Sequence, residues 1–140
     1  TRLTCIAVRN GQCSYDPRFA EKIGLGRPSF ERHDFFLPFY GLLESEIDMP
    51  KAHKLYEQAA AITYASEGDP PTWLGYSRPN GEVTDDTPLG AIVHHPKFGI
   101  ALKERLDGLG VECVVQYEGQ EGVEHVTESQ FIRKQFDLAR

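Results

Sequence analysis

The sequence predicts an α/β fold in which helices flank a parallel sheet. Three short apolar runs, at residues 3–8, 72–76 and 111–117, have the length and composition of strands buried within a sheet. Helical patterns follow the second and the third of these runs. Strands that alternate with helices in this way indicate a parallel sheet with right-handed crossover connections.

The first strand is expected over Leu3–Val8, where apolar and β-branched residues follow one another almost without a break. The pair Asn10-Gly11 is a turn signal that ends the strand. Residues 11–50 are punctuated by proline and glycine. We therefore expect an irregular insert between the first and second strands.

One short helix is expected inside this insert. Asp16 is a favourable N-cap, Pro17 suits the first helical position and Gly24 can end the helix. Aromatic residues crowd the following part of the insert, where they either pack it onto the rest of the protein or line an apolar pocket: Phe30, Phe35, Phe36, Phe39 and Tyr40.

The chain between the insert and the second strand has the composition of a helix over residues 51–61. A loop at residues 66–71 then leads into the second strand at residues 72–76. Residues 77–90 are polar and rich in turn formers, so we expect a loop there.

The clearest helical pattern covers residues 95–109. Its apolar positions recur at spacings that place one stripe along a helix: Phe98, Leu102, Leu106 and Leu109. Gly110 is well placed to end this helix in the left-handed conformation, and the third strand follows at once. A capping box at residues 127–130 predicts a last helix, on which Phe131, Gln135 and Leu138 share one side.

Length and charge exclude several classes of protein. The chain has 140 residues, enough for one domain with a modest core. Its net charge of −6 leaves no basic stripe to meet phosphate, so no nucleic-acid partner is expected. Its apolar runs are all shorter than the roughly 18 residues that a membrane span needs, so no membrane partner is expected either. A secretory signal peptide is not visible.

Three cysteines are too few and too scattered for a disulfide framework. Cys5 and Cys113 lie in apolar runs and are expected to be buried, whereas Cys13 lies in a loop-like segment and is expected to be accessible. A C-x-x-C pair is absent from the sequence, which argues against a structural zinc site. The cysteine usage fits a reducing compartment, and we expect a cytoplasmic protein without a cofactor.

The first strand raises the question of what covers it. The chain begins with Thr1 and enters this strand almost immediately. An apolar strand at the edge of a three-stranded sheet invites aggregation and is normally paired or covered. We therefore expect an N-terminal half that precedes this chain, or a dimer partner, to cover Leu3–Val8.

Three segments carry a family resemblance. The loop AAITYASEGDPP leads into the strand TWLGY, and the helix and strand IALKERLDGLGVECVVQY follow. This order resembles the C-terminal half of an α/β-hydrolase of the esterase and lipase-like branch, most closely over residues 56–117. The resemblance implies that residues 1–140 are one C-terminal portion of such a domain, with three strands of its sheet and residues 11–50 as a lid or cap.

The resemblance also implies site residues. The acid of a catalytic triad would be Asp85 or Asp86, in the loop after the second strand. The triad histidine would be His125, just ahead of the last helix. The substrate would be a small ester or amide, attacked by a serine.

The nucleophile of such a triad is not in this sequence. The motif G-x-S-x-G is absent, and Cys13 and Ser14 lack the glycine pair and helix of a nucleophile elbow. The family carries that elbow ahead of the first strand found here. We therefore expect the 140-residue chain alone to be inactive and a complete protein to act as a carboxylic-ester hydrolase.

Two departures from the family pattern favour an alternative, a non-catalytic module for binding or assembly. Asp85 and Asp86 come ten or more residues after Gly75 rather than two or three, and acidic residues surround His125. An independent flavodoxin-like domain is a third reading, but the first strand lacks a glycine-rich phosphate loop. His94 and His95 are interpreted as the start of a helix, with a metal site or a substrate pocket as the alternatives.

Overall fold

The structure, a computed structural model, describes residues 3–26 and 34–138. Within these residues the sheet has three parallel strands in the order β1-β2-β3: β1 (Ile6–Arg9), β2 (Thr72–Pro79) and β3 (Cys113–Glu118). The α-helices are α1 (Pro17–Lys22), α3 (Phe36–Tyr40), α4 (Pro50–Ala59), α5 (Leu89–Ile92), α6 (Lys97–Asp107) and α7 (Glu128–Leu138). Two 3₁₀ turns, η1 (Glu44–Glu46) and η2 (Ala61–Tyr64), flank α4. The α/β class and the parallel sheet predicted from the sequence are confirmed.

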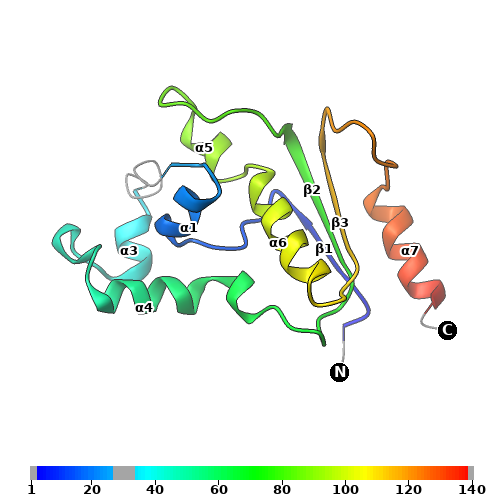
Figure 1. The fold of residues 1–140 in the computed structure, drawn as a ribbon, viewed down its shortest axis with the longest axis horizontal. Coiled ribbons are helices and arrows are strands. Elements are labelled where there is room, and N and C mark those ends of the chain that lie inside the picture. The colour runs from blue at the N-terminus through cyan, green and yellow to red at the C-terminus, as the bar shows by residue number, and fades with distance from the viewer. Residues whose placement is uncertain (1–2, 27–33, 139–140) are drawn as a thin grey trace.

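The helices form two layers on the sheet. Figure 1 shows α1, α3, α4, α5 and α6 on one side and α7 on the other. The strands are neighbours in chain order, so both connections step across the sheet in the same direction. Because such crossovers are right-handed, both come to lie on the same face. The opposite face is covered by α7, which follows the last strand.

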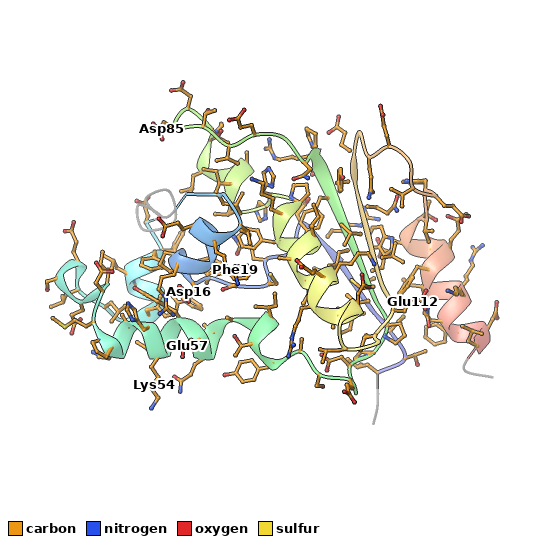
Figure 2. All side chains as sticks on the ribbon, in the orientation of Figure 1. Asp16, Phe19, Lys54, Glu57, Asp85 and Glu112 are labelled. Atoms are coloured by element: carbon orange, nitrogen blue, oxygen red, sulfur yellow. The ribbon has the colours of Figure 1, made fainter. Side chains whose placement is uncertain are left out.

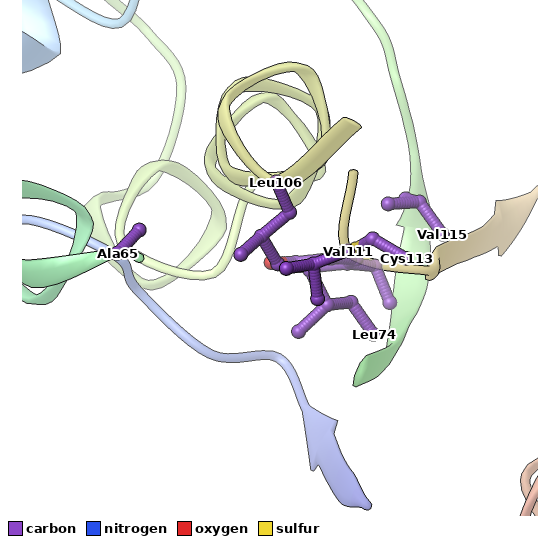
Figure 3. Close-up of a cluster of buried hydrophobic side chains, with 7 residues drawn as sticks. Ala65, Leu74, Leu106, Val111, Cys113 and Val115 are labelled. Carbon is purple, nitrogen blue, oxygen red and sulfur yellow. The ribbon is translucent and has the colours of Figure 1, made fainter. Parts of the chain in front are cut away.

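The main core lies between α6 and the sheet. Figure 3 shows Leu106 of α6 above Leu74 of β2 and Cys113 and Val115 of β3. The predicted apolar stripe of this helix is confirmed, because Phe98 and Leu106 are buried and Leu102 and Leu109 pack against the buried clusters. Gly110 adopts a φ of 71°, which is the expected left-handed end of the helix.

A close approach of α6 to the sheet depends on Gly99. A Cβ atom at this position would lie 2.4 Å from Cε2 of Tyr76, the last buried residue of β2. The Tyr76 ring cannot easily move away, because its hydroxyl donates a hydrogen bond of 2.8 Å to the carbonyl of Gly11. The glycine therefore sets the distance between the helix and the central strand.

The insert is more regular than the sequence predicts. Its first helix is the expected one: Asp16 is the N-cap, and its side chain accepts a hydrogen bond from the Arg18 N–H. The Arg18 guanidinium also contacts Glu57 of α4 at 3.3 Å, which joins the two helices. Of the predicted aromatics, Phe36 and Tyr40 pack with Tyr56 of α4 in a separate cluster, whereas Phe35 and Phe39 are mostly exposed. Phe30 lies outside the described residues.

The prediction for the cysteines holds for Cys113 but not for Cys13 or Cys5. Cys13 is buried, with its thiol 3.2 Å from the carbonyl of Phe98 in α6, because this helix packs over the start of the insert. Cys113 is buried as expected, whereas Cys5 is only partly buried on the edge of the sheet. Burial raises the pKa of the Cys13 thiol to about 12, so this thiol is not available as a nucleophile.

Replacing Gly99 with alanine should destabilise the fold. The added methyl group overlaps the fixed Tyr76 ring, and overpacking of this kind costs about 1–3 kcal/mol. Alanine recovers about 1 kcal/mol through its better helix propensity, so we expect a net loss of up to about 2 kcal/mol in the free energy of unfolding. Urea denaturation followed by circular dichroism measures this difference.

Gly90→Ala is the matched control for this experiment. Gly90 lies in α5, where a Cβ atom would meet no neighbour within 4 Å. This variant should be as stable as the parent or slightly more stable. Equal stability of the two alanine variants would contradict the role given to Gly99.

Candidate functional site

A pocket of about 430 Å³ lies where the three strands end. Its walls come from the carboxyl end of each strand and from the chain that leads into α7: Arg9, Asn10, Trp73, Gly75, Tyr76, Ser77, Gln116, Tyr117, Glu118, His125, Thr127 and Glu128. Ligands of open α/β sheets bind outside the carboxyl ends of the strands. This pocket is therefore the candidate functional site.

The indole of Trp73 forms one wall of this pocket. A Cβ atom at Gly75 would lie 2.2 Å from the indole ring, so the ring lies across the glycine on the α7 side of β2. Its Nε1–H donates a hydrogen bond of 2.8 Å to the carbonyl of Val126. Only a residue without a side chain at position 75 leaves room for this arrangement.

His125 lies in the loop between β3 and α7, and the sheet holds this loop on both sides of it. The Trp73 indole bonds the carbonyl of Val126, and Nε2 of Gln116 donates to the carbonyl of Glu124 at 3.2 Å. Thr127 then caps α7, since its N–H donates to Oε1 of Gln130 at 2.8 Å. The His125 side chain is exposed at the pocket, as a group that exchanges protons with a substrate must be.

The structure places the two predicted aspartates away from His125. Asp85 and Asp86 are exposed in the long loop after β2, and neither lines the pocket. Figure 2 shows Asp85 above α5, on the side of the molecule away from α7. The structure therefore does not bring the predicted acid and the predicted histidine together.

Two glutamates do line the pocket with His125. Glu128, the first residue of α7, accepts a hydrogen bond of 2.6 Å from Nε of Arg9. Glu118, the last residue of β3, makes no ion pair with another described residue. Of the two pocket carboxylates, Glu118 is therefore the one available to form a hydrogen bond with the His125 imidazole.

Asn10 is a site residue that the sequence reading missed. It follows β1 with a φ of 51°, a left-handed conformation that asparagine tolerates better than most residues. Its Oδ1 accepts hydrogen bonds from the N–H and the hydroxyl of Ser77, at 3.0 and 3.2 Å. The available signal was the Asn10-Gly11 turn, which indicated where the strand ends but not that the asparagine lines a pocket.

The paired histidines have different roles. Nδ1 of His95 accepts a hydrogen bond of 3.2 Å from the Lys97 N–H at the start of α6, which supports the interpretation as a helix start. Its Nε2 lies 3.1 Å from the carbonyl of Gly81 and must therefore carry the proton. Nδ1 of His94 bonds the carbonyl of Asn10 at 2.8 Å.

In residues 3–26 and 34–138, no group of three or more His, Cys, Asp or Glu side chains is gathered closely enough to hold a metal ion. Of the helices in the same ranges, none combines the length and apolar character needed to cross a bilayer.

Comparisons with known proteins find no matching family model, no matching curated protein and no matching solved structure.

His95 should make the stability of the protein depend on pH. Burial lowers the pKa of His95 below the ordinary value of 6.5, and Lys97 acts in the same direction. Between the lowered pKa and about 6.5 the unfolded chain binds the proton and the folded chain does not. Stability must therefore rise with pH in this window and fall when the pH drops through about 6.5.

Urea denaturation from about pH 7.5 to about pH 5.5 tests this expectation. His95→Gln should lose much of the pH dependence, because glutamine cannot take up the proton. His94→Gln is the control and should keep it, since the buried His95 is intact. An unchanged slope in His95→Gln would contradict the assignment.

Proposed function

We propose that this chain supplies the histidine-bearing part of an acyl-hydrolase active site, with His125 as the general base. The observation that carries the proposal is the anchoring of His125 at the carboxyl edge of the sheet. Gln116 and Trp73 bond the carbonyls of the residues on either side of it, which supports a fixed backbone position for His125 beside the pocket that it lines. The resemblance to an α/β-hydrolase supports the same assignment.

The order of the elements also supports this proposal. In an α/β-hydrolase the triad histidine follows a strand and precedes a helix, as His125 does between β3 and α7. The base would take a proton from a serine as the serine attacks the carbonyl carbon of a small ester or amide. That serine would come from a segment outside residues 1–140, because these residues lack a nucleophile elbow.

The edge of β1 is where such a segment would join. The N–H groups of Ile6 and Asn10 donate to the carbonyls of Pro71 and Gly75, so they point toward β2. Since direction alternates along a strand, the N–H groups of Ala7 and Arg9 point away from the sheet. A further strand paired there in parallel would bring its own carboxyl end to the pocket.

His125→Ala should abolish most of the esterase activity of the complete protein. Removing a general base typically lowers the rate 10²–10⁴-fold, and we expect kcat for p-nitrophenyl acetate to fall within about this range. Glu121→Ala is the control, because this exposed residue lies in the same loop but does not line the pocket. Equal rates for His125→Ala and the parent would exclude His125 as the base.

The carboxylate that orients His125 can be identified by three amide substitutions. From the geometry we expect Glu118→Gln to lower kcat at least about tenfold, since a neutral amide stabilises the imidazolium less well. Asp85→Asn and Asp86→Asn should leave kcat within about twofold of the parent, a change too small for a triad acid. A large loss in either aspartate variant instead would restore the assignment based on the family resemblance.

Amide hydrogen exchange of the complete protein tests the proposed pairing at β1. The N–H groups of Ala7 and Arg9 should exchange slowly if a further strand is present, because they would then be hydrogen bonded. Asn10, whose N–H already bonds Gly75, is the internal reference for protection. Fast exchange at Ala7 and Arg9 beside a protected Asn10 would show that the edge is open to solvent.

A non-catalytic binding or assembly module is the second candidate function. The position of Asp85 and Asp86 favours it, because a triad needs its acid beside the histidine. Such a module would keep the pocket and bind a small polar ligand without converting it. A complete protein that carries a nucleophile elbow but does not hydrolyse short esters would support this second function.

A further inference from the structure

The side-chain amide of Asn10 is held in one orientation at the pocket. The backbone N–H of Ser77 can only donate, so the Asn10 atom 3.0 Å from it must be the oxygen. The Ser77 hydroxyl bonds the same oxygen at 3.2 Å. This pattern settles which end of the amide is the nitrogen and directs Nδ2 away from Ser77.

The backbone of Asn10 is fixed as firmly as its side chain. Its N–H donates to the carbonyl of Gly75 at 2.8 Å, and its own carbonyl lies 2.8 Å from Nδ1 of His94. These bonds hold the residue at a φ of 51°. Residues other than glycine that are held in this region gather at ligand sites, where the surrounding contacts maintain the conformation.

The Nδ2 group of Asn10 is a hydrogen-bond donor without a partner among the described residues. Across residues 3–26 and 34–138, the hydrogen bonds of Asn10 involve its Oδ1, its N–H and its carbonyl but not Nδ2, although Asn10 lines the pocket. A fixed donor of this kind, already oriented before a ligand arrives, binds an acceptor at little cost in conformational entropy.

The charges of the pocket indicate which acceptor suits it. The single guanidinium on its wall, Arg9, is paired with Glu128, and Glu118 adds a second carboxylate. An anionic ligand would meet a net negative wall, so a phosphate or carboxylate is disfavoured. A neutral carbonyl oxygen is the acceptor that fits both the free donor and the charge.

We propose that Nδ2 of Asn10 donates a hydrogen bond to the carbonyl oxygen of a neutral ester or amide bound in this pocket. The inference rests on the proposed function for the substrate class, and it adds a substrate-positioning residue that the sequence motifs do not include. Ser77 acts through Asn10, by holding the amide with its nitrogen toward the ligand.

Two substitutions separate this role from a structural one. Asn10→Asp keeps an oxygen for both Ser77 bonds and tolerates the left-handed backbone, but it replaces the Nδ2 donor with an acceptor. Asn10→Gly removes the amide altogether and adopts a positive φ without strain. The glycine variant adds no charge. It therefore still tests the role of Nδ2 if the aspartate variant does not fold.

The experiment is an NMR titration of the complete protein with N-methylacetamide, a neutral carbonyl compound that is not hydrolysed under these conditions. We expect the side-chain NH₂ resonances of Asn10 to move together with the indole N–H of Trp73, which reports that the pocket is filled. In Asn10→Asp and Asn10→Gly the dissociation constant, read from the Trp73 signal, should rise about tenfold, the usual effect of one lost hydrogen bond.

Ser77→Ala should have an intermediate effect on the dissociation constant of N-methylacetamide. It removes the hydroxyl bond but keeps the backbone N–H, so the dissociation constant should rise less than in the two Asn10 variants. Unchanged affinity in both Asn10 variants would overturn the proposal. Movement of the Trp73 signal without movement of the Asn10 amide would overturn it as well.

His125→Ala distinguishes a failure of this inference from a failure of the proposed function. If His125→Ala keeps its esterase activity while the Asn10 variants lose affinity, the proposed base is wrong and the positioning role of Asn10 stands. If His125→Ala is inactive and the Asn10 variants bind normally, the base stands and the positioning role fails.

Discussion

A parallel sheet whose strands are neighbours in chain order must carry both of its connections on one face, and the rest of this structure depends on that constraint. The insert and α6 share that face and build the larger core there. Among the described residues, the opposite face is covered by α7, whose first residue lies beside the carboxyl end of the sheet. The pocket forms in the space between that helix start and the strand ends.

The central strand links the stability of the fold to the geometry of the site. Tyr76 packs under α6 and bonds the carbonyl of Gly11, and the next residue, Ser77, bonds the side chain of Asn10. Trp73, on the other face of the same strand, holds the loop of His125. One strand therefore positions the turn after β1 and the loop after β3. A change that shifts β2 must disturb both sides of the pocket.

Features that depend on neighbouring residues could be predicted from the sequence. The Asp16 cap, the capping box at Thr127 and the left-handed Gly110 all follow from bonds formed within a few residues. The strand at residues 72–76 was also predicted. Its extension through Ser77 to Pro79 was not, because these exposed polar residues carry no apolar pattern.

Features that depend on distant contacts could not be predicted in the same way. Cys13 is buried by a helix that lies 85 residues further along the chain, and nothing in its own neighbourhood indicates this contact. The position of His125 followed from the order of the elements. The direction of the loop that carries Asp85 could not be predicted. A polar, turn-rich segment has no apolar pattern that shows against which part of the fold it packs. Asn10 was missed because its neighbour in space, Ser77, is remote in sequence.

The arrangement of Trp73 gives this protein a built-in optical signal. Residues 1–140 contain one tryptophan, so all the indole emission of these residues comes from a ring that forms a wall of the pocket. The ring is almost completely buried, and its Nε1–H is bonded to the chain next to His125. Indole fluorescence depends on the polarity around the ring. The colour and intensity of the emission therefore report on the packing of the β3–α7 loop, without any added label.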